Sequence, residues 1–420
     1  MSDQKEHHVL YAGPDLNAAL EKSRAANSRS SSYYEPSPRI SAVGWAARAA
    51  VRHATRSVKN LALTNCREIR CRGIAEGTGN GVEIRYVGKG KNFSFLLDSF
   101  FKEYEVLAER SLPITAVVSA VRRPGSEDIL ITDLESTLVT PVDRGLIIPP
   151  WIKQRLQLPV DWHQFIASLP RKTRQELTRY LRKYKFKARI NDSDHAYARF
   201  YRELYSPHIA ARHIEQAVIV DEPEFYRDCA GTTLVELLHE GQVIGANVVR
   251  VSGNCLYILW CGMSDLVNKH NLKGATDALD YFSILYAACC GLSVVDLGRS
   301  RPRLNDGLLR YKAKWGAEIY LGRLRVAPIR IVPRNLRAAT ATLLANSAWI
   351  VRDKARLEGR IFVDDGPLTE ERIEQLRKEF LHKGIRQLWI GAIKGLSGEV
   401  KAGTGVWQGI KVADLKRCQD

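Results

Sequence analysis

The chain has 420 residues, of which 45% are hydrophobic and 26% are charged, a globular composition that excludes a largely disordered chain, a collagen-like repeat and a small disulfide scaffold. Its 63 lysines and arginines outnumber 46 acidic residues, so the formal net charge is +17. This basic surplus predicts polyanionic partners, such as nucleic acid, phosphorylated cofactors, acidic carrier proteins or anionic lipid.

The sequence carries no signal of a membrane-spanning, exported or metal-binding protein. Its longest uncharged runs, residues 281–295 and 338–351, are shorter than the roughly 20 apolar residues that a spanning helix needs. The polar N-terminus lacks the apolar segment of a signal peptide. The eight cysteines are scattered without a C-x-x-C pair, so neither a zinc site nor a disulfide framework is expected. These features predict a cytoplasmic protein.

Residues 1–60 are predicted to be a tail that contains one basic amphipathic helix. Apolar residues from Ile40 to Val58 recur at steps of three and four, and Arg48 begins a basic stripe on another face. Such a helix either packs on the following domain or lies on an anionic membrane surface. The second arrangement would place the protein peripherally at the inner face of the membrane.

Residues 61–160 are predicted to form a strand-rich segment that ends in a proline-containing stretch. The predicted elements are strands at 81–88, 114–121 and 128–134 and an apolar-periodic helix at 94–110. The glycine cluster at 77–81 opens no helix and lacks the G-x-G-x-x-G spacing, so it predicts a turn rather than a dinucleotide site.

Residues 161–330 begin with a helical stretch whose run 171–189 holds nine basic residues and one acidic residue. A second helix is expected over 194–213. The elements expected next are three hairpin-linked strands at 233–240, 242–252 and 255–263, a long helix at 273–290, a strand at 292–298, a basic loop and a helix at 305–316.

Residues 331–420 are predicted to form a C-terminal helix followed by a small strand–helix–strand unit. The apolar helix covers 335–350, and the unit consists of 359–365, 368–384 and 385–393. Thr369 is a plausible N-cap for the helix of that unit.

Two segments resemble the GNAT-fold subgroup that includes the BioF-like acetyltransferase domain and the Fem-type aminoacyltransferases. One is 200–213; in the other, 294–319, a strand ending in Asp296-Leu297-Gly298 leads through a loop to a lysine and Trp315-Gly316. The resemblance covers about residues 160–325. It implies an α/β fold with a mixed sheet and flanking helices, in which 161–330 is the acyltransferase domain. Residues 61–160 would then be a degenerate first half of a tandem GNAT-like pair.

Such a fold implies acyl transfer from an activated donor, held between splayed strands with its phosphates at a helix N-terminus. The best match to the phosphate motif Q/R-x-x-G-x-G/A is 271–276, so Asn271, Lys273 and Gly274 are the expected donor-binding residues. Only one glycine of the motif is present, and a helix start or close packing would also explain it. Arg299 and Arg301 follow a strand end and would either clamp a phosphate or carboxylate or form a solvated loop.

Three residues are candidates for catalysis. Tyr311 would donate a proton to the leaving group, as tyrosine does in many GNAT enzymes. His213 would be a general base at neutral pH, and Lys312 would face the site if Lys314, on another helix face, does not. Each has a purely structural alternative. Asp306 is expected to cap the helix that carries Tyr311 rather than to act as a catalytic acid.

The first functional hypothesis is an N-acyltransferase that uses an acyl thioester, on coenzyme A or an acyl carrier protein, as co-substrate and has no tightly bound cofactor. The acceptor would be a primary amine on a small molecule, a sugar or a lipid such as a long-chain base. One alternative is Fem-type transfer from aminoacyl-tRNA, which the run 171–189 favours because its cations could follow a phosphate backbone. Another is a non-catalytic polyanion-binding module.

Overall fold

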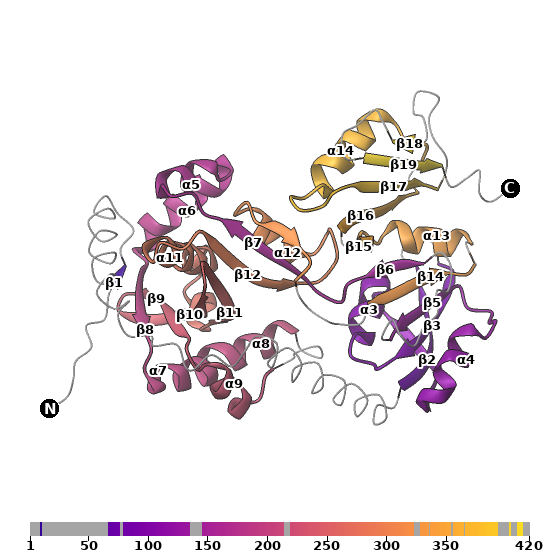
Figure 1. Cartoon of the computed structure of the whole chain (residues 1–420), viewed down its shortest axis with the longest axis horizontal. Helices are drawn as coiled ribbons and strands as arrows, with labels where there is room; N and C mark the ends of the chain where they lie inside the picture. Colours follow the sequence, from indigo (N-terminus) through magenta and orange to yellow (C-terminus); the bar gives the residue numbers. More distant parts are fainter. Residues whose placement is uncertain are drawn as a thin grey trace, which may run out of the picture. The chain divides into compact units, whose positions relative to one another are not determined.

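The computed structural model describes residues 9–10, 66–75, 79–134, 145–213, 219–322, 328–335, 337–353, 356–364, 366–393, 403–404 and 410–414 (Figure 1). The helix predicted within the N-terminal tail lies outside these ranges. The chain forms two compact units. The described part of unit 1 is the strand 9–10 with Lys153–Arg299 and Tyr311–Glu318, and the rest is unit 2. The strand 152–157 belongs to the sheet of unit 1, and the strand 329–333 belongs to a sheet of unit 2.

A mixed sheet forms the centre of unit 1, with the strand order β1-β8-β9-β10-β11-β12-β7-β13. Its strands are β1 (Val9–Leu10), β7 (Ile152–Gln157), β8 (Lys187–Asn191), β9 (Thr233–His239), β10 (Gln242–Ser252), β11 (Cys255–Met263), β12 (Val294–Ser300) and β13 (Glu318–Tyr320). The meander β9–β10–β11 confirms the three predicted strands. In its first turn, Glu240 and Gly241 both have positive φ, at 50° and 81°, as a tight hairpin turn requires.

Helices surround this sheet. They are α5 (Trp162–Ser168), α6 (Arg171–Tyr184), α7 (Asp194–Arg199), the π-helix η1 (Phe200–Tyr205), α8 (Ser206–His213), α9 (Glu222–Asp228), α10 (Leu266–Lys269), α11 (Ala275–Cys289) and α12 (Gly307–Ala313). Pro170 separates α5 from α6, and the residue that follows α6 as its C-cap, Lys185, has a φ of 50°. The basic run 171–189 is therefore a helix followed by a strand, and most of its charge lies on α6.

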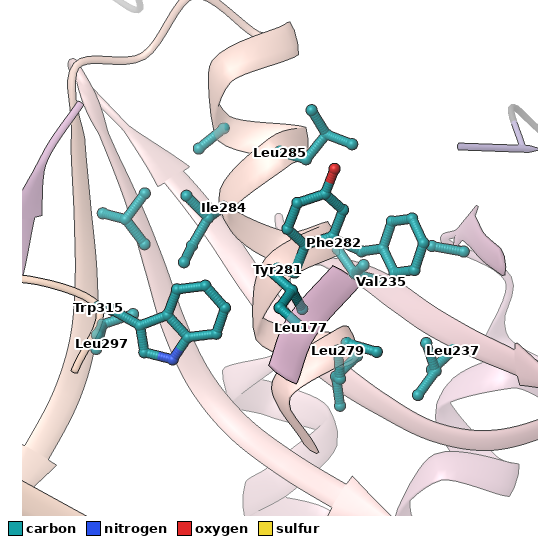
Figure 2. Close-up of a cluster of buried hydrophobic side chains, with 14 of the residues drawn as sticks. Leu177, Val235, Leu237, Leu279, Tyr281, Phe282, Ile284, Leu285, Leu297 and Trp315 are labelled. Carbon is teal, nitrogen blue, oxygen red and sulfur yellow. The ribbon is translucent and has the colours of Figure 1, made fainter. Parts of the chain in front are cut away.

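The long helix α11 is the central packing element of unit 1. Phe282, Ile284 and Leu285 of α11 are fully buried, and they belong to one cluster with Val235 and Leu237 of the sheet (Figure 2). Burial of these side chains stabilises the helix by about 1.5–3 kcal/mol for each. This packing fixes α11 against the sheet.

The strands β11 and β12 diverge. They are parallel, but their register pairs only Cys255–Tyr257 with Val294–Asp296, at the beginning of each strand. Beyond this point Gly298 has a φ of 78°, and its amide donates a 2.8 Å hydrogen bond to the Asp296 carboxylate. A meander, a crossover helix and a splayed parallel strand confirm the GNAT-like mixed sheet with flanking helices expected from the sequence.

Unit 2 contains two further sheets, with the orders β4-β2-β3-β5-β14-β6 and β15-β16-β17-β19-β18. The strands of the first are β2 (Cys66–Ile74), β3 (Gly81–Gly88), β4 (Tyr104–Leu112), β5 (Ile129–Asp133), β6 (Leu146–Ile148) and β14 (Ile329–Pro333). Those of the second are β15 (Trp349–Asp353), β16 (Arg356–Val363), β17 (Leu388–Ala392), β18 (Gly403–Thr404) and β19 (Ile410–Asp414). The helices are α3 (Phe93–Phe100), α4 (Ile114–Arg122), α13 (Ala338–Ala345) and α14 (Glu370–Phe380).

Three predictions for unit 2 were wrong. The strand predicted at 114–121 is the helix α4, whose buried residues Val117, Ala120 and Val121 follow helical spacing. The helix predicted at 94–110 ends at Phe100, and its second half is the edge strand β4. The helix predicted at 335–350 stops at Ala345, after which the chain enters β15. Tertiary contacts override local propensity in each case: α4 packs its apolar residues into the core, whereas β4 and β15 pair with β2 and β16.

Other local predictions were confirmed. The Thr369 side chain accepts a 3.3 Å hydrogen bond from the Arg372 amide at the start of α14. Asp306 accepts a 2.8 Å hydrogen bond from the Leu309 amide and so caps α12. Caps are local features, so the sequence predicts them without tertiary information.

Candidate active site

A cavity of about 450 Å³ lies at the N-terminus of α11 in unit 1. It contains three of the predicted donor-binding residues, Asn271, Lys273 and Gly274, and one predicted catalytic residue, Tyr311 of α12. The rest of its lining is Val267, Asn268, Leu272, Ala275, Thr276 and Asp277. The structure therefore brings the predicted donor motif together with a tyrosine that is distant in the sequence.

Gly274 begins α11 in a conformation that favours glycine. Its φ is 78°, and no side chain caps the helix. A Cβ at this position would lie 2.1 Å from the ring of Tyr180 on α6, so close packing also requires glycine here. An uncapped helix start is an anion-binding site, because its free N–H groups and the helix dipole favour negative charge.

The charges around this helix start favour an anion. The one acidic residue in the first turn of α11, Asp277, forms an ion pair of 2.5 Å with Lys314. Lys273 precedes Gly274 and adds a cation to the lining of the cavity. With Asp277 neutralised by its partner, Lys273 and the helix dipole set the sign of the local potential.

Tyr311 is connected to a buried polar network. Its hydroxyl donates a 2.7 Å hydrogen bond to the carboxylate of Asp280 on α11. Asn247 of β10 donates to Asp280 at 3.2 Å and to the hydroxyl of Ser283 at 3.0 Å. Asp280 is thus held from two elements, and it in turn fixes the orientation of the Tyr311 hydroxyl.

Burial changes the protonation of this pair. Burial raises the pKa of Asp280, while the hydrogen bonds from Tyr311 and Asn247 act in the opposite direction. Burial and the nearby Asp280 carboxylate raise the pKa of Tyr311, so Tyr311 is a neutral phenol at neutral pH. A phenol whose proton points to a carboxylate of raised pKa can accept a proton at its oxygen while releasing its own.

Two other predicted residues have structural contacts. Lys312 is buried, and its ammonium donates a 2.7 Å hydrogen bond to the carbonyl of Arg299, which ties α12 to the end of β12. The Arg299 side chain is exposed. Neither residue is part of the cavity lining, and Lys314 has a different partner from Lys312, since it pairs with Asp277.

Arg301 belongs to unit 2 and is enclosed by aromatic rings. Its guanidinium lies 3.8 Å from the ring centre of Trp151 and 4.0 Å from that of Phe95. Burial lowers its pKa to about 10. Arg299 belongs to unit 1 and its side chain is exposed. His213 ends α8, and its side chain lies outside the described residues.

Sequence analysis missed three features of unit 1, of which Asp280 and Tyr180 lie at the site and η1 lies against β11. Asp280 lies within the long run of buried residues of α11, and a charged residue among apolar neighbours is the signal that could have identified it. Tyr180 and the π-helix η1 carry no such signal. The backbone of η1 lies against Gly262 of β11, where a Cβ would be 2.7 Å from the Leu204 carbonyl carbon. Single turns of π-helix are frequent at functional sites.

Two kinds of feature are absent from the part of the chain that the structure describes. No group of His, Cys, Asp or Glu side chains among these residues could hold a metal ion. None of the described helices is long and apolar enough to span a membrane.

No protein-family model and no curated protein matches the chain. Among solved structures, L-PGS from Bacillus licheniformis is 10% identical, with 66% of this chain and 86% of that chain covered and a TM-score of 0.33. FemX is 10% identical, with 63% and 88% covered and a TM-score of 0.32. A tandem GNAT protein from the clavulanic acid biosynthesis pathway is 10% identical, with 79% and 100% covered and a TM-score of 0.27. At such TM-scores, no property of those proteins is carried over to this chain.

Proposed function

We propose that this chain is an N-acyltransferase that moves an acyl group from a thioester to a primary amine. The observation that carries the proposal is the cavity in which the uncapped start of α11, Lys273 and the Tyr311–Asp280 pair meet. It supplies an anion site for the donor and a proton acceptor for the amine within one recess.

The donor would bind by its phosphate and its backbone. A phosphate is expected on the N–H groups that follow Ala275 in the first turn of α11, because the Ala275 N–H already donates to the Leu272 carbonyl, and Lys273 would be the counterion. Where β11 and β12 diverge, their facing edges are free of mutual pairing, and a pantetheine arm could use these peptide groups.

The chemistry requires one proton to leave the amine and one to reach the sulfur. The amine nitrogen attacks the thioester carbonyl carbon, and the C–N bond forms as the C–S bond breaks. The amine proton passes to the Tyr311 oxygen while the phenolic proton moves to Asp280. The thiolate takes up a proton from water and leaves as a thiol. The hydroxide that remains takes back the proton from Asp280 through the Tyr311 hydroxyl, so the carboxylate is restored and amine and thioester give amide and thiol. The hydrogen bond favours this role for Tyr311 over the expected donation to the leaving group.

Transfer from an aminoacyl-tRNA is a second candidate, and the exposed cations of α6 favour it. The same anion site would then receive the terminal phosphates of the RNA, and the leaving group would be a ribose hydroxyl rather than a thiol. A location at a membrane surface, with a lipid amine as acceptor, remains a prediction from the sequence of the N-terminal tail.

Thermal stability with acyl-coenzyme A thioesters of increasing chain length tests the donor, with bulk tRNA as comparator. A ligand at ~100 times its Kd adds about 2.7 kcal/mol of stability. Stabilisation by thioesters, lost in K273A but kept in the matched variant K269A, would support the proposal. Salt-sensitive stabilisation by tRNA alone would favour the second candidate. Mass spectrometry with a long-chain base and an amino sugar as acceptors then tests transfer, which Y311F should abolish.

A further inference from the structure

One exposed face of α6 concentrates positive charge. Five of the six cations on this helix are exposed, and its single acidic residue is Glu176. The exposed cations are Arg171, Lys172, Arg179, Arg182 and Lys183. Within the described parts of the chain, none of them forms an ion pair with a carboxylate. We call these five residues the α6 basic face.

The helix that carries the α6 basic face packs against the segment that lines the donor cavity. Leu177 on the opposite side of α6 is buried in the unit 1 core. The Tyr180 ring covers Gly274, and the Tyr184 hydroxyl donates a 3.2 Å hydrogen bond to the Asn271 carbonyl. These contacts fix the helix against the loop that lines the cavity, so a partner bound on α6 would lie beside the anion site.

We infer that the α6 basic face docks an acidic acyl carrier protein, whose phosphopantetheine arm delivers the thioester into the cavity. This inference rests on the proposed function, because it names the carrier of the same thioester. The motif offers a single lysine and a single glycine, Lys273 and Gly274. That set suits the one phosphate of a phosphopantetheine arm better than the three phosphates of coenzyme A. A helix of 14 residues is about 21 Å long, enough to lie along one helix of a small partner.

The aromatic residues of α6 favour a protein over an RNA as the partner. Bases bind to exposed rings by stacking. The Tyr180 ring packs against Gly274, and the Arg179 guanidinium lies 4.7 Å from its centre. The Tyr184 ring packs against Phe186 and His239, with the Lys183 ammonium 4.9 Å from its centre. The surface therefore offers cations without free stacking platforms.

The test is a titration of full-length protein with fluorescently labelled palmitoyl-acyl carrier protein, at low and at raised salt. The variant R171E/R182E should weaken binding by at least about tenfold, because steering charges act on association. The variant R123E/R227E reverses two exposed charges, at the end of α4 and on α9, and should bind like wild type. Both variants should keep the stabilisation by palmitoyl-coenzyme A, which reports that the fold and the cavity are intact.

Several outcomes would overturn the inference. The first is that the carrier protein does not bind, and the second is that both variants lose binding equally. The third is that R171E/R182E loses its stabilisation by palmitoyl-coenzyme A. The fourth is that tRNA displaces the carrier protein from the wild type and that R171E/R182E no longer binds tRNA. Turnover of palmitoyl-coenzyme A without carrier-protein binding would overturn the inference and leave the proposed function standing. If no thioester, free or carrier-bound, binds to the protein or stabilises it, the proposed function itself is refuted.

Discussion

The variant G274A tests how α11 begins and what lies against it. A non-glycine residue at a φ of 78° costs about 1–2 kcal/mol. The added methyl would also lie 2.1 Å from the Tyr180 ring, and such overpacking typically costs about 1–3 kcal/mol more. The expected loss is therefore about 2–5 kcal/mol. Since the chain has two units, local stability is best measured by hydrogen exchange of peptides from α6 and α11.

Two controls separate the cost of the backbone conformation from the cost of the clash with Tyr180. Gly241 has a φ of 81°, and a Cβ added there would have no atom within 4 Å, so G241A should lose only the conformational term, about 1–2 kcal/mol. In a Y180A background the clash is gone, and G274A should cost no more than G241A does. If G274A alone costs no more than G241A, or if Y180A does not reduce its cost, the proposed contact between the two helices is wrong.

Three further predictions concern other parts of the structure. Because burial raises the pKa of Asp280, the folded protein keeps a proton that the unfolded chain releases, so wild-type stability should fall as pH rises above the ordinary carboxyl range. The variant D280N should lack this fall in thermal unfolding. Equal slopes of melting temperature against pH in wild type and D280N would refute the raised pKa of Asp280. G262A should destabilise unit 1 by about 1–3 kcal/mol through the Leu204 backbone, whereas G307A, with open space around it, should be nearly neutral; similar melting curves would contradict this. R301A should lower the free energy of unfolding of unit 2 by about 2 kcal/mol, since two ring contacts are lost, and an unchanged melting temperature would show that they contribute nothing.

The arrangement of the site also shows why one glycine is sufficient at the start of α11. In this chain α11 starts directly after Gly274, and the Tyr180 ring of α6 packs against Gly274. A second glycine is not needed for close approach, because the single left-handed residue already exposes the helix start. Asn271, with a φ of 47°, is held by its carbonyl contact with Tyr184.

Local chemistry made several parts of this protein predictable. The meander β9–β10–β11 was predicted from short apolar runs and turn residues, and α11 from a long apolar helix pattern. The caps Asp306 and Thr369 depend on residues only three positions apart. The motif around Gly274 was also found from sequence spacing, and the structure places it at a helix start beside Tyr311.

The tertiary structure decided what local patterns cannot contain. Residues 114–121 and 104–112 have apolar content compatible with either helix or strand, and pairing with β2 fixed the second as an edge strand. Arg299 and Arg301 are two positions apart, yet only the packing of Phe95 and Trp151 determines that Arg301 is enclosed. The pairing of Tyr311 with Asp280 joins residues 31 positions apart. Periodicity and capping act over a few residues, whereas burial, desolvation and hydrogen-bond networks depend on which distant segments the fold brings together.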